Sequence, residues 1–203
     1  MSELLRETAS QTAGPYVHIG LAPRQAGFDI FENNFGNVLV EPETKGERIR
    51  IEGIVYDGSG TPVRDVLIEC WQANAAGKYN HPGDRQEGKA VDPTFRGWGR
   101  ACSDFDSGVY AFETIKPGVV AGRKGRPMAP HIALWIVARG INLGLTTRMY
   151  FSDEPEANAA DPLLTRIDFP PYRRDTLIGQ RNGSTVTFDI VLQGEGETVF
   201  LDI

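Results

Sequence analysis

The chain has 203 residues, a formal net charge of −6 and a pI near 5.1. The acidic balance argues against non-specific nucleic-acid binding, which needs a basic face to displace counterions. No apolar run approaches the roughly 18 residues that a membrane-spanning helix needs. The length indicates one domain, or at most two small ones. The 23 glycines and 13 prolines favour short strands and many turns over long helices.

The two cysteines, Cys70 and Cys102, are too few for a disulfide framework. The N-terminal string MSELLRETASQ has no apolar core, so it does not look like a signal peptide. Together these features are typical of a reducing compartment, and we expect a cytoplasmic protein. We expect neither a membrane nor a nucleic acid among its partners.

Residues 1–47 show no helical period, so we expect an irregular N-terminal arm that packs on the domain and on a partner. Strong apolar alternation begins at Ile49 and predicts a half-buried strand. After a turn at 57–60, residues 63–71 are expected to form the returning strand. The long polar loop at 73–97 is of the kind that usually carries function.

The second half of the chain repeats the pattern of short apolar runs separated by turns. Further strands are expected at residues 98–105, 109–115, 131–139, 145–151, 184–192 and 198–203. Residues 153–181 have a helical pattern that prolines keep short. The fold class is therefore predicted to be all-β, a β-sandwich of about eight short strands over residues 48–203, with a short helical insertion.

Three motifs carry a resemblance to a known family. They are IEGIVYDGSGTPVRDVLIECWQANAAGKY at 51–79, TIKPG at 114–118 and PMAPHI at 127–132. Together they resemble the intradiol ring-cleaving dioxygenases, which open catechols with ferric iron. The arm string ETASQTAGPYVHIGL and the ending QGEGETVFLDI resemble one subunit type within that family.

The resemblance implies an iron site of two tyrosinates and two histidines, and ferric iron suits anionic phenolate oxygen. Tyr79 matches the first tyrosine and His131 the first histidine. The second tyrosine position falls at Val119 or Val120, with Val120 favoured, and the second histidine position is Ala133. Since neither replacement can coordinate a metal, we expect these to be vestigial ligand positions. We expect no metal and no catalytic residue in this chain.

The resemblance also implies a partner. Members of this type pair α and β chains of similar fold, and Fe(III) is held by the homologous β subunit. The complex cleaves protocatechuate with O₂ to 3-carboxy-cis,cis-muconate, a step of the β-ketoadipate pathway, in a symmetric (αβ)n oligomer. Six apolar side chains of the arm are then expected to pack partly on neighbours: Phe28, Ile30, Phe31, Phe35, Val38 and Leu39.

Protocatechuate carries a ring carboxylate, and burying that group unpaired is costly. A planar guanidinium holds a carboxylate with two parallel hydrogen bonds. Arg139, at the end of the apolar run 131–139, is the candidate for this contact. Arg148 on the next strand is a weaker candidate. The alternative for Arg139 is an ordinary salt bridge at the rim.

The arm supplies the second group of candidate substrate-binding residues: Thr12, Gly14, Pro15 and Tyr16. Glycine lets the backbone approach a ligand closely, and proline holds the chain rigid. Tyrosine offers a flat apolar face and a polar tip to an aromatic pocket. The alternative is a turn that only anchors the arm on the sandwich.

Two other functions compete with the partner-subunit interpretation. One is a self-sufficient intradiol dioxygenase with altered iron ligands. The other is a non-enzymatic β-sandwich that serves as a binding module, because one fold hosts many functions.

Overall fold

The computed structural model describes residues 11–32, 34–122, 125–166 and 170–202, so the prediction for residues 1–10 lies outside the described part. Eleven strands lie in the described ranges: β1 (Arg48–Tyr56), β2 (Leu67–Trp71), β3 (Trp98–Cys102), β4 (Val109–Ile115), β5 (Val120–Ala121), β6 (Pro127–Met128), β7 (His131–Val137), β8 (Leu145–Phe151), β9 (Ile178–Asn182), β10 (Thr185–Thr187) and β11 (Ile190–Val191). Three short helices accompany them: α1 (Val17–Leu21), α2 (Pro155–Ala160) and α3 (Pro171–Asp175).

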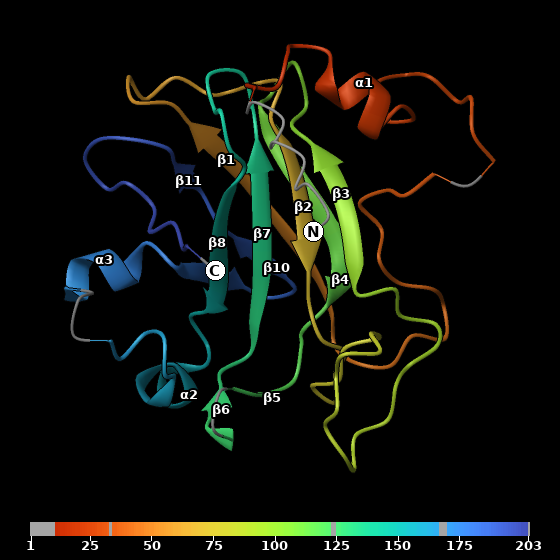
Figure 1. Cartoon of the computed structure of the whole chain (residues 1–203), viewed down its shortest axis with the longest axis vertical. Coiled ribbons are helices and arrows are strands. Elements are labelled where there is room, and N and C mark those ends of the chain that lie inside the picture. The colour runs from red at the N-terminus through yellow and green to blue at the C-terminus, as the bar shows by residue number, and fades with distance from the viewer. Residues whose placement is uncertain (1–10, 33, 123–124, 167–169, 203) are drawn as a thin grey trace, which may run out of the picture.

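Nine of the strands form one mixed sheet in the order β11-β1-β10-β9-β8-β7-β2-β3, and β4 pairs with β1. The sheet folds over into two layers, with β2, β3, β7 and β8 in front of β1, β4, β10 and β11 (Figure 1). β1 is the hub, because it pairs antiparallel with β4 and parallel with β10 and β11. The predicted all-β sandwich is confirmed.

The burial pattern of β1 shows how the sequence directs this packing. Ile49, Ile51 and Val55 are nearly fully buried, and the residues between them are partly exposed, apart from a glycine on the buried side. That residue, Gly53, lies so close to the neighbouring segment between β10 and β11 that a Cβ would be 2.0 Å from the carbonyl oxygen of Phe188. The alternation thus builds the core, and the glycine lets two backbones approach closely.

Several elements differ from the sequence prediction. A helix, α1, forms within the arm, and β5 pairs with β6 inside a predicted loop. The last residues of the predicted helical insertion, from Ile178 on, lie in strand β9, because β8 and β10 offer them backbone partners on both sides. The strand predicted at 198–203 is not present over its described part, residues 198–202. Those residues make single backbone hydrogen bonds to Val191 and Thr146.

Residues 34–47 cross the sandwich without forming a strand. Isolated bridges join Val38 to Glu113 and Val40 to Phe95, and Leu39 is buried in the main core. Within the described residues, none of the helices has the length and apolar character needed to cross a bilayer.

Candidate functional site

Two of the sequence motifs meet at one end of the sandwich. Gly77 has a φ of +75°, and a Cβ there would lie 1.9 Å from the carbonyl oxygen of Val119. A Cβ on Gly118 would lie 2.4 Å from the carbonyl oxygen of Ala75. The Gly-x-Tyr loop and the Lys-Pro-Gly turn are therefore in direct backbone contact. This contact explains why both motifs end in glycine-dependent turns.

Tyr79 is held on this loop by its ring and its backbone. The ring stacks on Trp71, with centroids 5.7 Å apart and planes 7° apart. The backbone N–H of Tyr79 donates to Asp84 Oδ2 at 2.8 Å. Burial raises the pKa of the Tyr79 hydroxyl, although the positive charge of Arg148 opposes the rise. Tyr79 is thus a neutral phenol rather than a tyrosinate.

His131 begins β7 and is buried. Its Nδ1 lies 2.7 Å from the carbonyl oxygen of Ala129, so Nδ1 carries the proton and donates. Burial lowers the pKa of His131 to about 4, and the nearby positive charge of Arg148 adds to the effect. The imidazole is therefore neutral, and the bond to Ala129 leaves Nε2 as its unprotonated nitrogen.

Arg148 lies close to Tyr79 and His131, among the predicted ligand positions. It is directly opposite Ala133 in the β7–β8 pair. Its Nη1 is 3.5 Å from Met128 Sδ, and its buried Nε has no hydrogen-bond partner among the described residues. Its charge reaches both Tyr79 and His131, since it affects both of their pKa values. A guanidinium cation thus occupies the neighbourhood in which the resemblance would put a metal cation.

The residues present do not fit Fe(III). Val120 is buried in β5, Val119 is 42% exposed, and neither has a donor atom. The Ala133 methyl group has none either. One phenol and one imidazole remain, too few for a ferric site, and the Arg148 charge repels a second cation. In the described ranges, no group of three or more His, Cys, Asp or Glu side chains could hold a metal ion.

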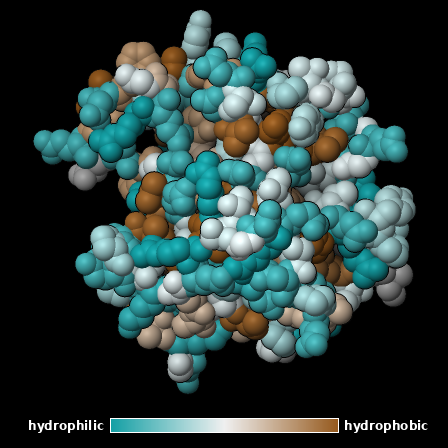
Figure 2. Space-filling model, turned by 180° about the vertical axis from the view of Figure 1, so that it is seen from behind, coloured by the Kyte–Doolittle hydropathy of each residue, from teal (hydrophilic) through white to brown (hydrophobic). Residues whose placement is uncertain are grey.

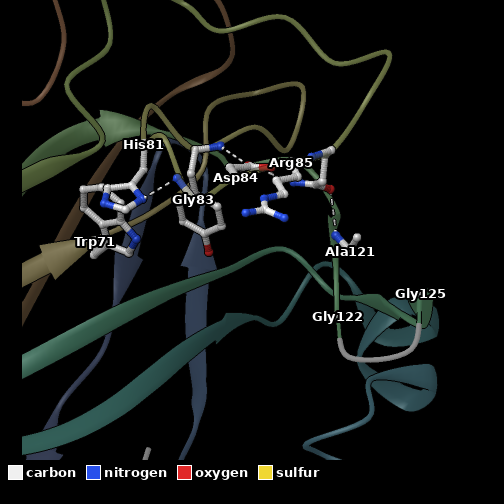
Figure 3. Close-up of a pocket in the computed structure, with 10 residues that line it drawn as sticks. Trp71, His81, Gly83, Asp84, Arg85, Ala121, Gly122 and Gly125 are labelled. Carbon is white, nitrogen blue, oxygen red and sulfur yellow. Dashed lines mark hydrogen bonds between the residues drawn. The ribbon is translucent and has the colours of Figure 1, made fainter.

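A cavity of about 620 Å³ nevertheless opens beside Tyr79. It lies between the loop after β2 and the β5–β6 hairpin, and the Arg85 side chain extends toward that space (Figure 3). The backbone N–H of Ala121 donates to Gln86 Oε1 at 2.8 Å and ties the two walls together.

Arg139 lies beyond the other end of β7. Its side chain is 62% exposed, and its Nε is 2.5 Å from Oδ2 of Asp65, a carboxylate that is only 7% exposed. The arm forms hydrogen bonds with the backbone on both sides of Arg139. The Thr12 hydroxyl accepts from Gly140 N at 2.8 Å, and its single proton lies within reach of Ala138 O at 3.4 Å and Ala13 O at 3.3 Å. The structure thus brings Arg139 and Thr12 together, and the rim salt bridge considered for Arg139 is present.

The rest of the arm segment leads into α1. Val17 N donates to Gly14 O at 3.2 Å, and Ile19 N donates to Tyr16 O at 3.0 Å, so the Gly14–Pro15–Tyr16 turn starts the helix. The Tyr16 side chain is 74% exposed. The segment therefore anchors the arm and also presents an aromatic ring to the surroundings.

The two groups of candidate residues are separate. His131 and Arg139 flank β7, whose seven residues span about 20 Å. Figure 1 shows β7 running from the β5–β6 hairpin toward the end of the sandwich where α1 lies. Tyr79, His131 and Arg148 at one end and the arm group at the other therefore do not form one site within this chain.

Comparison with known proteins assigns the family. Residues 32–194 match the family described as Dioxygenase. The α chain of protocatechuate 3,4-dioxygenase from Pseudomonas putida is 50% identical, with 98% of each chain covered. The chain belongs to the intradiol dioxygenase family.

Other relatives show how far this likeness extends. The β chain of protocatechuate 3,4-dioxygenase from Burkholderia cepacia is 38% identical, over 80% of this chain and 71% of that one. Among solved structures, the dioxygenase domain of a dioxygenase–carbohydrate-binding fusion from Streptomyces sp. SirexAA-E has a TM-score of 0.57 and 26% identity. It covers 96% of this chain and 100% of that one. Intradiol dioxygenases are iron-dependent, so the poor fit of the residues around Tyr79 and His131 to Fe(III) bears on the function of this member.

Sequence reasoning missed Asp65 and the placement of Arg148. Asp65 stands just before a strand in the string VRDVL, where an aspartate looks like part of a surface turn. The signal that identifies it is the register of β2 and β7, in which Leu67 faces Val137. The register of Arg148 against Ala133 would likewise have placed the cation beside the lost ligand.

Proposed function

We propose that this chain is the iron-free α subunit of a protocatechuate 3,4-dioxygenase. It completes the active-site cavity of an iron-bearing β subunit, and the complex cleaves protocatechuate with O₂ to 3-carboxy-cis,cis-muconate. The observation that carries the proposal is the donor set: Val120 and Ala133 replace two ligands, and Arg148 supplies a positive charge beside them. The likeness to both α and β chains supports it.

Arg139 contributes to the partner's cavity by binding the ring carboxylate of protocatechuate. It is exposed, so it can reach a ligand that lies outside this chain. Its planar fork matches a carboxylate with two charge-assisted hydrogen bonds. Thr12, Gly14, Pro15 and Tyr16 form the wall next to it, because the Thr12 hydroxyl holds the peptides on both sides of Arg139.

The arm also presents the apolar surface that an obligate partner would cover. Of the six apolar arm residues singled out in the sequence, Leu39 is buried in the core. The other five are about half exposed or more: Phe28 47%, Ile30 67%, Phe31 55%, Phe35 56% and Val38 47%. Separate brown patches also interrupt the hydrophilic rear face (Figure 2). We propose that αβ pairs bury the arm surface and assemble further into a symmetric (αβ)n oligomer.

Both cysteines are free thiols, with Cys70 buried and Cys102 partly exposed. Free thiols persist in a reducing compartment. We therefore extend the proposal to a cytoplasmic enzyme of aromatic catabolism.

The decisive experiment measures iron content and visible absorption of the chain purified alone and of the chain co-expressed with its β partner. Tyrosinate bound to Fe(III) has a charge-transfer band, so the test is direct. We expect a colourless, iron-free chain and a coloured, active pair. A chain that alone binds stoichiometric iron and cleaves protocatechuate would overturn the proposal and favour the self-sufficient enzyme. A chain that forms no complex with an iron-bearing homologue would favour the binding module.

A companion experiment introduces a tyrosine and a histidine at the two positions that lack donor atoms. Val120→Tyr with Ala133→His should still bind no iron, because Arg148 keeps its charge beside the site. Adding Arg148→Gln should permit iron binding and the tyrosinate band. Val119→Tyr in place of Val120→Tyr is the matched control for the choice of position. Iron binding with Arg148 still in place would show that its charge does not exclude the metal.

A further inference from the structure

Asp65 is a buried carboxylate that the proposed function does not use. Its side chain is 7% exposed, and neither of its oxygens has a hydrogen-bond partner of acceptable geometry among the described residues. Its one recorded ion pair is the contact between Oδ2 and Arg139 Nε at 2.5 Å. A buried carboxylate with a single cationic neighbour is costly unless that neighbour stays in place.

The sheet register explains why the two side chains meet. Leu67 faces Val137 in the antiparallel pair of β2 and β7. Asp65 and Arg139 each lie two residues outward from this pair, so they fall on the same face and opposite each other. The contact is thus built by the fold and does not depend on a chance surface encounter.

The segment that carries Asp65 is itself held in place. Val66 N donates to the Ser103 hydroxyl at 3.2 Å, and Ser103 N donates to Val66 O at 3.1 Å. On the other side, Thr12 holds the peptides that flank Arg139. Backbone and side chain of Arg139 are therefore both restrained, although its guanidinium is mostly exposed.

The geometry of the ion pair leaves one edge of the guanidinium available. Nε faces Asp65, whereas Nη1 and Nη2 have no recorded partner within the described residues. An arginine can bind a carboxylate end-on through these two nitrogens while Nε remains engaged elsewhere. The exposed edge is the one that a ligand outside this chain would meet.

We propose that Asp65 is a positioning residue for substrate recognition: it holds Arg139 through Nε so that the Nη1–Nη2 edge faces the carboxylate of the aromatic substrate. The inference rests on the proposed role of Arg139. Asp65 removes the conformational cost of ordering a long exposed side chain when the substrate binds.

The test is steady-state kinetics of the αβ complex with protocatechuate. Asp65→Asn keeps the shape of the side chain and removes its charge. We expect KM to rise about threefold to tenfold, the cost of ordering one arginine, with kcat unchanged. Asp65→Glu, which restores the charge, should return KM to within about twofold. Asp175→Asn, an exposed aspartate on α3, is the matched control and should leave KM unchanged.

A second pair of variants separates this inference from the proposed function. If Arg139→Ala leaves KM unchanged, the carboxylate contact itself fails. If Arg139→Ala raises KM while Asp65→Asn leaves KM unchanged or lowers it, the carboxylate contact stands but Asp65 is not a positioning residue. Adding Asp65→Asn to Arg139→Ala should have no further effect on KM, and an additive rise would also overturn the inference.

Arg139→Lys provides a test that does not depend on the folding of an Asp65 variant. A lysine ammonium keeps the charge but lacks the separate Nε and Nη edges. We therefore expect Arg139→Lys to lose most of the affinity that Arg139→Ala loses. A KM within about twofold of the parent would contradict the two-edge geometry.

Discussion

The two ends of β7 differ in what they keep from the family pattern. At the end that begins with His131, the loops, the cavity and two potential ligand side chains remain, but Arg148 supplies the positive charge. At the end that leads to Arg139, the chain presents an exposed cation held by a buried anion. The same strand thus leads from a cavity beside Tyr79 at one end to the Arg139–Asp65 ion pair about 20 Å away at the other.

The largest effect is expected at Gly77, which fixes the backbone contact at the vestigial end. Gly77→Ala should lower the free energy of unfolding by about 3 kcal/mol or more, because φ is positive and the new Cβ would meet Val119. Gly88→Ala is the matched control: its φ is +77° and nothing lies within 4 Å of the added carbon. It should cost about 1 kcal/mol. Urea denaturation measures both, and equal costs would show that the close contact is unimportant.

The buried His131, at the same end of the sandwich, should make the free energy of unfolding sensitive to acid. Its folded pKa, about 4, is below the ordinary value of 6.5, so the unfolded chain binds a proton that the folded chain excludes between these pH values. Stability should therefore fall by about 2 to 3 kcal/mol as pH drops from 7 to 4.5. Asp84, with a pKa lowered to about 2, contributes only at more acidic pH.

The corresponding measurement is the free energy of unfolding at pH 7 and at pH 4.5. In His131→Gln the difference between the two values should largely disappear. His81→Gln changes an exposed histidine and should retain the parent's difference. If His131→Gln is as acid-sensitive as the parent, the buried imidazole is not the cause.

Arg139→Ala tests the opposite end of β7, where the substrate carboxylate is proposed to bind. Losing a charge-assisted pair to the substrate carboxylate should raise KM for protocatechuate about 10- to 100-fold, with the fold and the iron content of the complex unchanged. Arg173 lies on α3 and pairs with Glu197, and Arg173→Ala serves as the control. A KM that moves equally in both variants would mean that general charge, and not the fork of Arg139, attracts the substrate.

The smallest effect on the chain itself is expected in the arm. Phe31 is 55% exposed, so Phe31→Ser should change the free energy of unfolding by less than about 0.5 kcal/mol. It should weaken association with the β chain about tenfold if its ring lies at the interface. Analytical ultracentrifugation of the mixture measures this. Unchanged association would remove Phe31 from the interface.

The sequence predicts the positions of individual strands better than it predicts which strands pair with one another. Apolar alternation predicts the start of β1, and short apolar runs between turns predict β4 and β8, all within a residue of the observed bounds. The sequence pattern wrongly predicts a helix at β9. Ile178–Asn182 forms a strand because β8 and β10 lie beside it. The absence of donor atoms in the side chains of Val120 and Ala133 is visible in the sequence, and their assignment to former ligand positions stays a prediction. The contact of Asp65 with Arg139 is not visible in the sequence, because it depends on the register of two strands far apart in sequence.

The pairing of β1 with β10 and β11 has a consequence for biosynthesis. The second backbone edge of β1, at residues 48–56, finds its partners only at residues 185–191. During translation this edge stays unpaired until nearly the whole chain has left the ribosome, and unpaired edges invite association with other chains. Non-local pairing of this kind also slows folding. Truncation before residue 185 should therefore yield aggregates rather than a smaller folded domain.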